Sequence, residues 1–98
     1  MTATCVVGKE ASLASMRSRL QGLQTRKSNL EMEVLNRLEE AERQFKAHCD
    51  IANLSEIDQE AYDRLMRNLR EERQKHQRLA DSITELGSKI NAAESRAN

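Results

Sequence analysis

The sequence predicts an all-α protein, an antiparallel two-helix hairpin that packs as a coiled coil. Three observations predict this fold. The 98 residues contain no proline, 2% aromatic and 33% charged residues, a composition typical of long amphipathic helices. Apolar residues recur every three or four positions, the spacing of one helix face. A single stretch near the midpoint, "AHCDIANLSEIDQEAYD" over residues 47–63, interrupts the pattern, which predicts one turn between two helices.

The composition also limits the class of protein. One Phe, one Tyr and no Trp cannot fill a deep globular core, and this length allows one domain at most. Disorder is the competing class, but the net charge is zero and the leucines are periodic. The apolar run Cys5–Val7 is too short for a signal sequence or a membrane span. We therefore expect a soluble, intracellular, cytoplasmic protein.

The first helix is expected over residues 10–48, after a flexible N-terminal tail of residues 1–9. Its apolar positions alternate in steps of three and four, and Lys27 occupies one position of the series. Two consecutive steps of four, from Leu30 through Val34 to Leu38, form a stutter that locally relaxes a left-handed supercoil. The apolar series is Leu13, Met16, Leu20, Leu23, Leu30, Val34, Leu38, Ala41 and Phe45.

The second helix is expected over residues 55–95, after a turn at residues 49–54. Ser55 is a suitable N-cap because its hydroxyl accepts from an early backbone N–H, and Asp58 follows at the capping-box position. Acidic residues in the first turns oppose the positive end of the helix dipole. The apolar series is Ile57, Ala61, Leu65, Leu69, Leu79, Ile83, Leu86, Ile90, Ala93 and Ala97.

A chain that folds back near residue 53 brings together residues whose numbers sum to about 106, as antiparallel packing requires. Apolar residues then meet apolar residues, for example Phe45 with Tyr62. One continuous helix would explain neither this match nor the Ser55 cap. We call the apolar line between the two helices the seam. The predicted seam residues are Met16, Leu20, Leu23, Leu30, Val34, Ala41, Phe45, Leu65, Leu79, Ile83, Leu86 and Ile90.

Three polar residues, Lys27, Glu72 and His76, interrupt the seam. Polar seam residues fix the register at some cost in stability, and a poorly closed section of this kind is also a place for a partner helix. Gly22 and Gly87 fall at nearly the same level of the hairpin. They mark a bend, a close backbone approach or two neutral positions.

The residues that carry soft metal-ligand chemistry lie far apart in the hairpin. His48 and Cys49 are at the turn, His76 is in mid-helix and Cys5 is in the tail. No metal spacing motif is present, and no nucleophile has an oriented base. We therefore expect no catalytic, cofactor-binding or metal site, and no enzyme activity.

An apolar patch wider than the seam is expected near the turn. Leu35 and Met66 lie off the seam, beside Leu38, Tyr62 and Leu69, and two helices cannot bury both sides of this surface. An isolated pair of helices is also marginally stable. The five residues are therefore the expected interface for self-association, for example into a four-helix bundle, or for another protein's helix.

Residues 64–78 carry six basic residues against Glu71 and Glu72. This basic stripe is the alternative functional surface, because it could contact nucleic-acid phosphates. The arginines expected to make this contact are Arg64, Arg67, Arg70 and Arg78. No aromatic residue interleaves with it and the chain is neutral. The arginines are equally suited to pair with glutamates of the other helix, such as Glu39.

The expected function is that of a non-enzymatic protein-interaction module, a structural, adaptor or chaperone-like subunit of a larger assembly. In architecture the hairpin resembles the two-helix stalk proteins of type III secretion and flagellar export, and small coiled-coil subunits of tethering complexes. This resemblance implies partners that are helical proteins. No residue motif accompanies it, so it assigns no functional residues.

Overall fold

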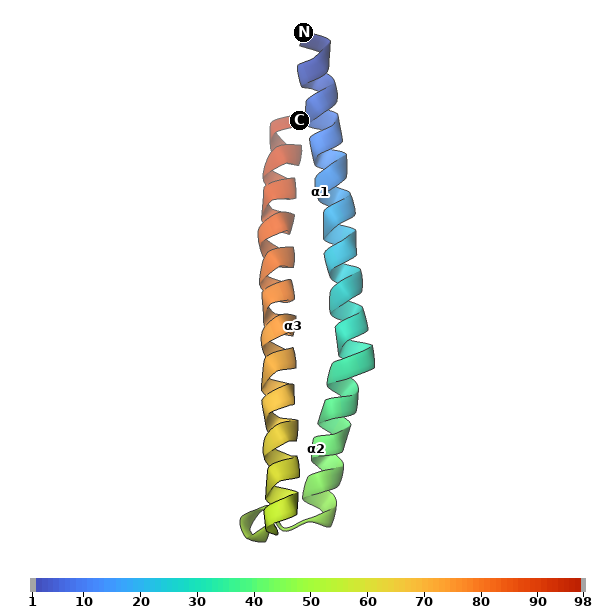
Figure 1. The fold of residues 1–98 in the computed structure, drawn as a ribbon. Helices are drawn as coiled ribbons and strands as arrows, with labels where there is room; N and C mark the ends of the chain where they lie inside the picture. The colour runs from blue at the N-terminus through green and yellow to red at the C-terminus, as the bar shows by residue number, and fades with distance from the viewer. Residues whose placement is uncertain (1, 98) are drawn as a thin grey trace. The chain divides into compact units, whose positions relative to one another are not determined.

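The computed structural model describes the backbone of residues 2–97 and the side chains of residues 12–96. Over the described backbone the protein contains helices and no strand, which confirms the all-α class. The described backbone forms three α-helices (Figure 1), with a π-helical turn between the first two and a 3₁₀ turn between the last two. In chain order the elements are α1 (Thr2–Leu30), a π-helical turn (Glu31–Leu35), α2 (Asn36–His48), a 3₁₀ turn (Ile51–Asn53) and α3 (Glu56–Ala97).

The described residues divide into two compact units. The turn unit is residues 28–77, which include the π-helical turn, α2 and the first half of α3. The terminal unit is residues 2–27 of α1 together with residues 78–97, the second half of α3. The predicted tail, residues 1–9, has helical backbone from Thr2. Its side chains lie outside the described residues, and its flexibility stays a prediction.

Two side chains hold the connection between α2 and α3, which Figure 1 shows as a short green segment. The Asp50 carboxylate accepts from the backbone N–H of Ala52 at 3.1 Å and from the Asn53 amide at 3.0 Å. The Ser55 hydroxyl accepts from the backbone N–H of Asp58 at 3.3 Å. The predicted N-cap of the second helix is thereby confirmed, because it satisfies a donor that has no partner within the helix.

The π-helical turn between α1 and α2 changes which residues are covered there. Such a turn holds one more residue than an α-helical turn, so the covered face moves by one position. Leu35 is 6% exposed, whereas Val34 is only half-buried. The sequence pattern placed Val34 on the seam and Leu35 beside it. The chain thus widens one turn at the place where the sequence predicted a stutter.

In α2 the predicted positions Leu38 and Phe45 stay on the covered side, and one predicted position differs. Glu39 and Glu42 are half-buried, whereas Ala41, a predicted seam residue, is exposed. Phe45 packs against Tyr62 with ring centroids 5.3 Å apart and planes tilted by 46°, a favourable geometry for aromatic pairs. The predicted contact between these two rings is confirmed.

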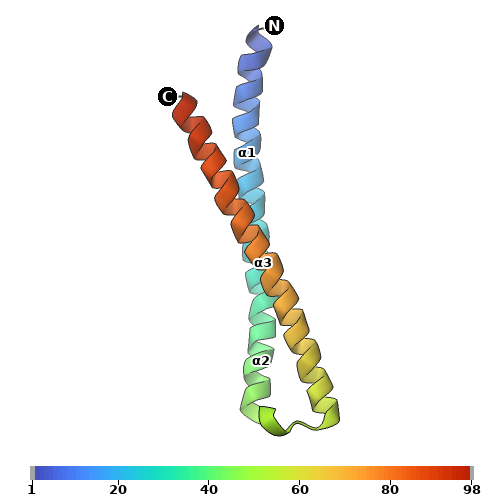
Figure 2. The same ribbon diagram turned by 90° about the vertical axis from the view of Figure 1, so that its left-hand side faces the viewer.

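The terminal unit has a more regular apolar line. Leu86 and Ile90 on α3 are 9% and 6% exposed, four residues apart and therefore on one helix face. Arg17 of α1 donates to the Glu94 carboxylate at 2.8 Å across this unit. The other predicted seam residues of this unit are half-buried, namely Met16, Leu20, Leu23, Leu79 and Ile83. Figure 2 gives a second view of the same helices.

Candidate interaction site

The five predicted interface residues divide into two groups by exposure. Leu69 is fully covered at 0% exposure and Leu35 is 6% exposed. Both are therefore packed within the turn unit. Leu38, Tyr62 and Met66 are half-buried. The part of the predicted patch that remains accessible to a partner is thus formed by Leu38, Tyr62 and Met66.

Several polar side chains of the turn unit are half-buried. His76 Nε2 is 2.6 Å from Glu31 Oε1, with the two side chains 28% and 44% exposed. Glu72 is also half-buried and pairs along α3 with Lys75 at 3.0 Å. Lys27, the third predicted polar position, is half-buried in the terminal unit. A specific pair such as Glu31 with His76 fixes the alignment of two helices along their axes.

The remaining predicted seam positions, Leu30 of α1 and Leu65 of α3, are half-buried in the turn unit. Two large apolar residues of the turn unit are mostly exposed. Ile57 is 80% exposed and Met32 is 68% exposed. Ile57 lies in the first turn of α3, and Met32 lies in the π-helical turn. The sequence pattern had placed Ile57 on the covered face.

The basic stripe is exposed along α3. Arg73 lies 4.0 Å from Glu39 of α2, as expected for pairing between helices. Among the described residues, Arg64 and Arg67 have no ion pair, but they line a surface depression of about 210 Å³ together with Glu60 and Asp63. The two carboxylates offset part of the local positive potential. Arg70 and Arg78 are exposed as well.

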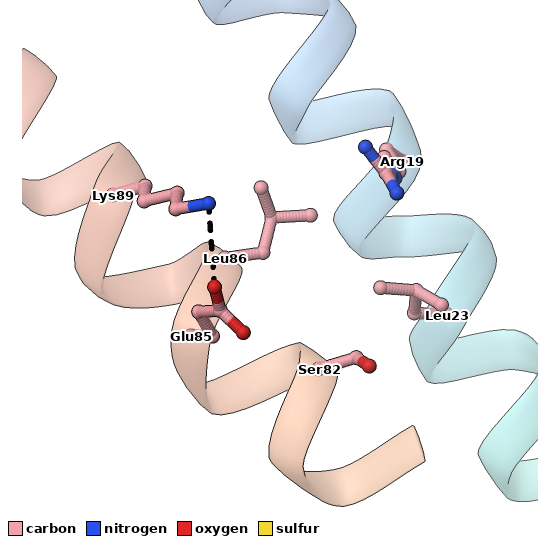
Figure 3. A pocket seen from close by; sticks show the side chains of 6 residues that line it. All are labelled: Arg19, Leu23, Ser82, Glu85, Leu86 and Lys89. Atoms are coloured by element: carbon pink, nitrogen blue, oxygen red, sulfur yellow. Dashed lines mark ion pairs between the residues drawn. The ribbon is translucent and has the colours of Figure 1, made fainter. Parts of the chain in front are cut away.

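A second depression, of about 120 Å³, lies in the terminal unit. Leu23 and Leu86 project toward each other from the two helices, and Arg19, Ser82, Glu85 and Lys89 surround them (Figure 3). Lys89 pairs with Glu85 at 3.3 Å. Drug-sized ligand sites are usually larger clefts with a few convergent polar groups. This shallow depression is instead typical of incomplete packing between two helices.

Glu40 of α2 lies in a local cluster of hydrogen bonds. The pKa of Glu40 lies below its ordinary value because its carboxylate accepts from Gln44 and, secondly, from Arg43. Within the described part of the chain, no group of three His, Cys, Asp or Glu side chains is arranged to hold a metal ion. Cys49 is a free, half-buried thiol, and the Cys5 side chain lies outside the described residues.

Comparisons with known proteins assign no family. No family model matches the chain, and neither the curated proteins nor the solved structures include a significant match. Over its described residues, no helix is both long enough and apolar enough to cross a membrane. The predicted cytoplasmic location stays a prediction.

Proposed function

We propose that this protein is a non-enzymatic interaction module, an antiparallel coiled-coil hairpin whose half-covered apolar faces are completed by another helical protein or by a second copy. In this role it acts as a structural, adaptor or chaperone-like subunit of a larger assembly. The observation that carries the proposal is the incomplete core. Among the described side chains, the apolar ones that are buried are Leu35, Leu69, Leu86 and Ile90.

The incomplete core matters because burial supplies most of a helix's stability in a folded protein. Long faces of Leu, Ile and Met are only half-buried in both units. Each such side chain gains roughly 1.5–3 kcal/mol when it passes from full exposure to full burial. A partner helix that covers a few of them would therefore stabilise both itself and this chain.

The pairing of the helices supports the hairpin part of the proposal. In the turn unit Glu31 lies beside His76, and Phe45 lies beside Tyr62. As one residue number rises the other falls, which is the order of antiparallel helices. In the terminal unit Arg17 lies beside Glu94 and Leu23 faces Leu86, which is the same order.

The surface that we assign to the partner is the accessible patch of Leu38, Tyr62 and Met66. The test compares Met66→Glu with Met32→Glu, the same substitution at a methionine that is 68% exposed. Affinity capture from the native source and sedimentation equilibrium of the purified chain give the readout, and circular dichroism checks the helices. We expect Met66→Glu to lose partners or self-association by about tenfold or more, since a lost apolar contact costs roughly 1.4 kcal/mol or more. Equal behaviour of the two variants and the wild type would reject this surface.

The alternative function, binding of nucleic acid by the basic stripe, has one favourable observation. Arg64, Arg67 and Arg70 are exposed and have no ion pair among the described residues. The nearby Glu60 and Asp63 oppose it. Phosphate binding weakens steeply as salt rises, so titration of a labelled duplex at two salt concentrations separates this function from apolar docking.

A further inference from the structure

The charges of this neutral chain are divided unequally between its two units. Residues 1–27 and 78–98 contain eight Lys and Arg against four Asp and Glu, a net charge of +4. Residues 28–77 contain eight Lys and Arg against twelve Asp and Glu, a net charge of −4. Such segregation favours attraction between unlike units of two molecules and disfavours contact between like units.

The terminal unit presents a basic face on α1. Arg19 and Arg26 are exposed and form no ion pair among the described residues. They are seven residues apart, which is two helical turns or about 10.5 Å. Gly22 lies between them on the same face, and a Cβ added there would meet nothing within 4 Å. A second helix can therefore approach closely between the two arginines.

The turn unit presents an acidic and apolar face on α3. Glu56, Glu60 and Asp63 are exposed, and their spacing of four and three residues places them on one side of the helix. The basic stripe begins directly after them with Arg64 and Arg67, which line one depression with Glu60 and Asp63, so the acidic face is confined to the first two turns of α3. Glu56 and Asp63 are also seven residues apart, so they repeat the spacing of the two arginines. Ile57 adjoins them and is 80% exposed, so most of this apolar side chain is open to solvent.

We propose that the partner of this surface is a second copy of the chain. The acidic face of one copy, Glu56, Glu60 and Asp63 with Ile57, docks on the basic face of the other copy, Arg19 and Arg26 with Gly22. The inference rests on the proposed function, because it names the partner of an interaction module. Every copy carries both faces, and the charged residues of each face repeat with the same spacing of seven residues.

The test is a charge exchange, measured by sedimentation equilibrium of the full chain from micromolar to millimolar concentration under reducing conditions. One variant carries Arg19→Glu and Arg26→Glu, and the other carries Glu60→Lys and Asp63→Lys. Glu56 is left unchanged because it lies in the first turn of α3, where it opposes the helix dipole. The matched control carries Arg78→Glu and Arg96→Glu on α3, which alter the terminal unit's charge equally but leave Arg19 and Arg26 of α1 unchanged.

We expect each face variant alone to associate roughly 10- to 100-fold more weakly than the wild type, because attractive pairs become repulsive. An equimolar mixture of the two face variants should recover the affinity, since each face of one variant is then opposite in charge to the matching face of the other. The control should change the affinity by less than about threefold, within the range of exposed charges. Circular dichroism must show intact helices in all variants.

Several results overturn the inference. The inference is wrong if the wild-type chain stays monomeric throughout the concentration range, or if the face variants associate like the wild type. It is also wrong if the mixture fails to recover association, because that result excludes this pairing of faces. None of these results touches the capture experiment with Met66→Glu, so a failed dimer and a failed interaction module remain distinguishable.

Discussion

The turn unit and the terminal unit solve the same problem, the packing of one helix on another, in different ways. The terminal unit uses a regular apolar line with Leu86 and Ile90 at its centre. The turn unit buries Leu69 completely, yet it also contains a widened helical turn and the polar pair of Glu31 and His76. Tight burial and a regular repeat are therefore separable properties within one short chain.

This comparison teaches where the register of the helices is specified. A regular apolar repeat can slide by one heptad at little cost, because similar side chains meet again after seven residues. A π-helical turn and a single polar pair cannot slide without losing their contacts. The terminal unit also has a polar pair, Arg17 with Glu94, but both of its side chains are more exposed than His76. We infer that the turn unit contributes more to the alignment.

The largest expected effect is that of Leu69→Ala. Removal of a fully covered leucine side chain should lower the free energy of unfolding by about 2–5 kcal/mol. Urea unfolding followed by circular dichroism measures the total loss. Hydrogen exchange should show the loss of amide protection first in residues 28–77, since opening of a protein is local before it is global.

Leu86→Ala in the terminal unit is the matched control, because the same atoms are removed from a side chain that is 9% exposed. Its loss of protection should be largest in the second half of α3. A loss below about 1 kcal/mol for Leu69→Ala, as is typical of surface sites, would contradict the turn unit as the better-packed region. So would identical exchange patterns in the two variants.

The next effect concerns the widened turn. Leu30 and Leu35 are five residues apart, the spacing that a π-helical turn stacks on one face. Deletion of the exposed Met32 leaves them four residues apart, which is the spacing of an ordinary α-helix. We expect this deletion to change the free energy of unfolding by less than about 1 kcal/mol, within the range of surface changes.

Deletion of the exposed Arg43 in α2 is the control. It has no widened turn to absorb it, so it rotates neighbouring residues by about 100° and displaces Phe45 from Tyr62. This should cost roughly 1.5–3 kcal/mol for the displaced side chain. If deletion of Met32 costs as much as deletion of Arg43 in the same urea titration, the widened turn does not set the covered face.

The sequence was sufficient to predict the helical class, the Ser55 cap and the contact of Phe45 with Tyr62. Each of these features depends on the local spacing of residues or on the folding back of a periodic chain. Local spacing and chain reversal can both be recognised in the order of the residues. The widened turn could not be located, because Val34 and Leu35 are adjacent and both apolar. Either can be the covered one, and the choice depends on packing against α3 rather than on spacing.

The candidate interaction site was predicted only in part for the same reason. Once Leu35 becomes the covered residue, Leu38, Tyr62 and Met66 are what remains accessible. Glu42 replaces Ala41 on the covered side of α2, a position at which a periodic reading favours the alanine. The exposure of Ile57 could not be seen either, since its place in the apolar series suggests burial. Its three acidic neighbours, Glu56, Asp58 and Glu60, were the available signal that this turn faces water.

The effect of His76→Leu on stability is also small, but this substitution is the sharpest test of the register. A polar residue between helices costs stability while it fixes alignment. The His76 side chain is 28% exposed, so leucine gains only part of its full burial energy, and the lost pair with Glu31 is worth about 1 kcal/mol or less. We expect a gain of about 1 kcal/mol in the free energy of unfolding. We also expect broadened or doubled amide resonances in the turn unit, which report alternative alignments.

The control is His48→Leu at an exposed position near the end of α2. Its free energy of unfolding should stay within about 0.5 kcal/mol of the wild type, with unchanged spectra. A His76→Leu chain that is less stable, or that keeps a single sharp set of resonances, would show that the alignment does not depend on this polar pair.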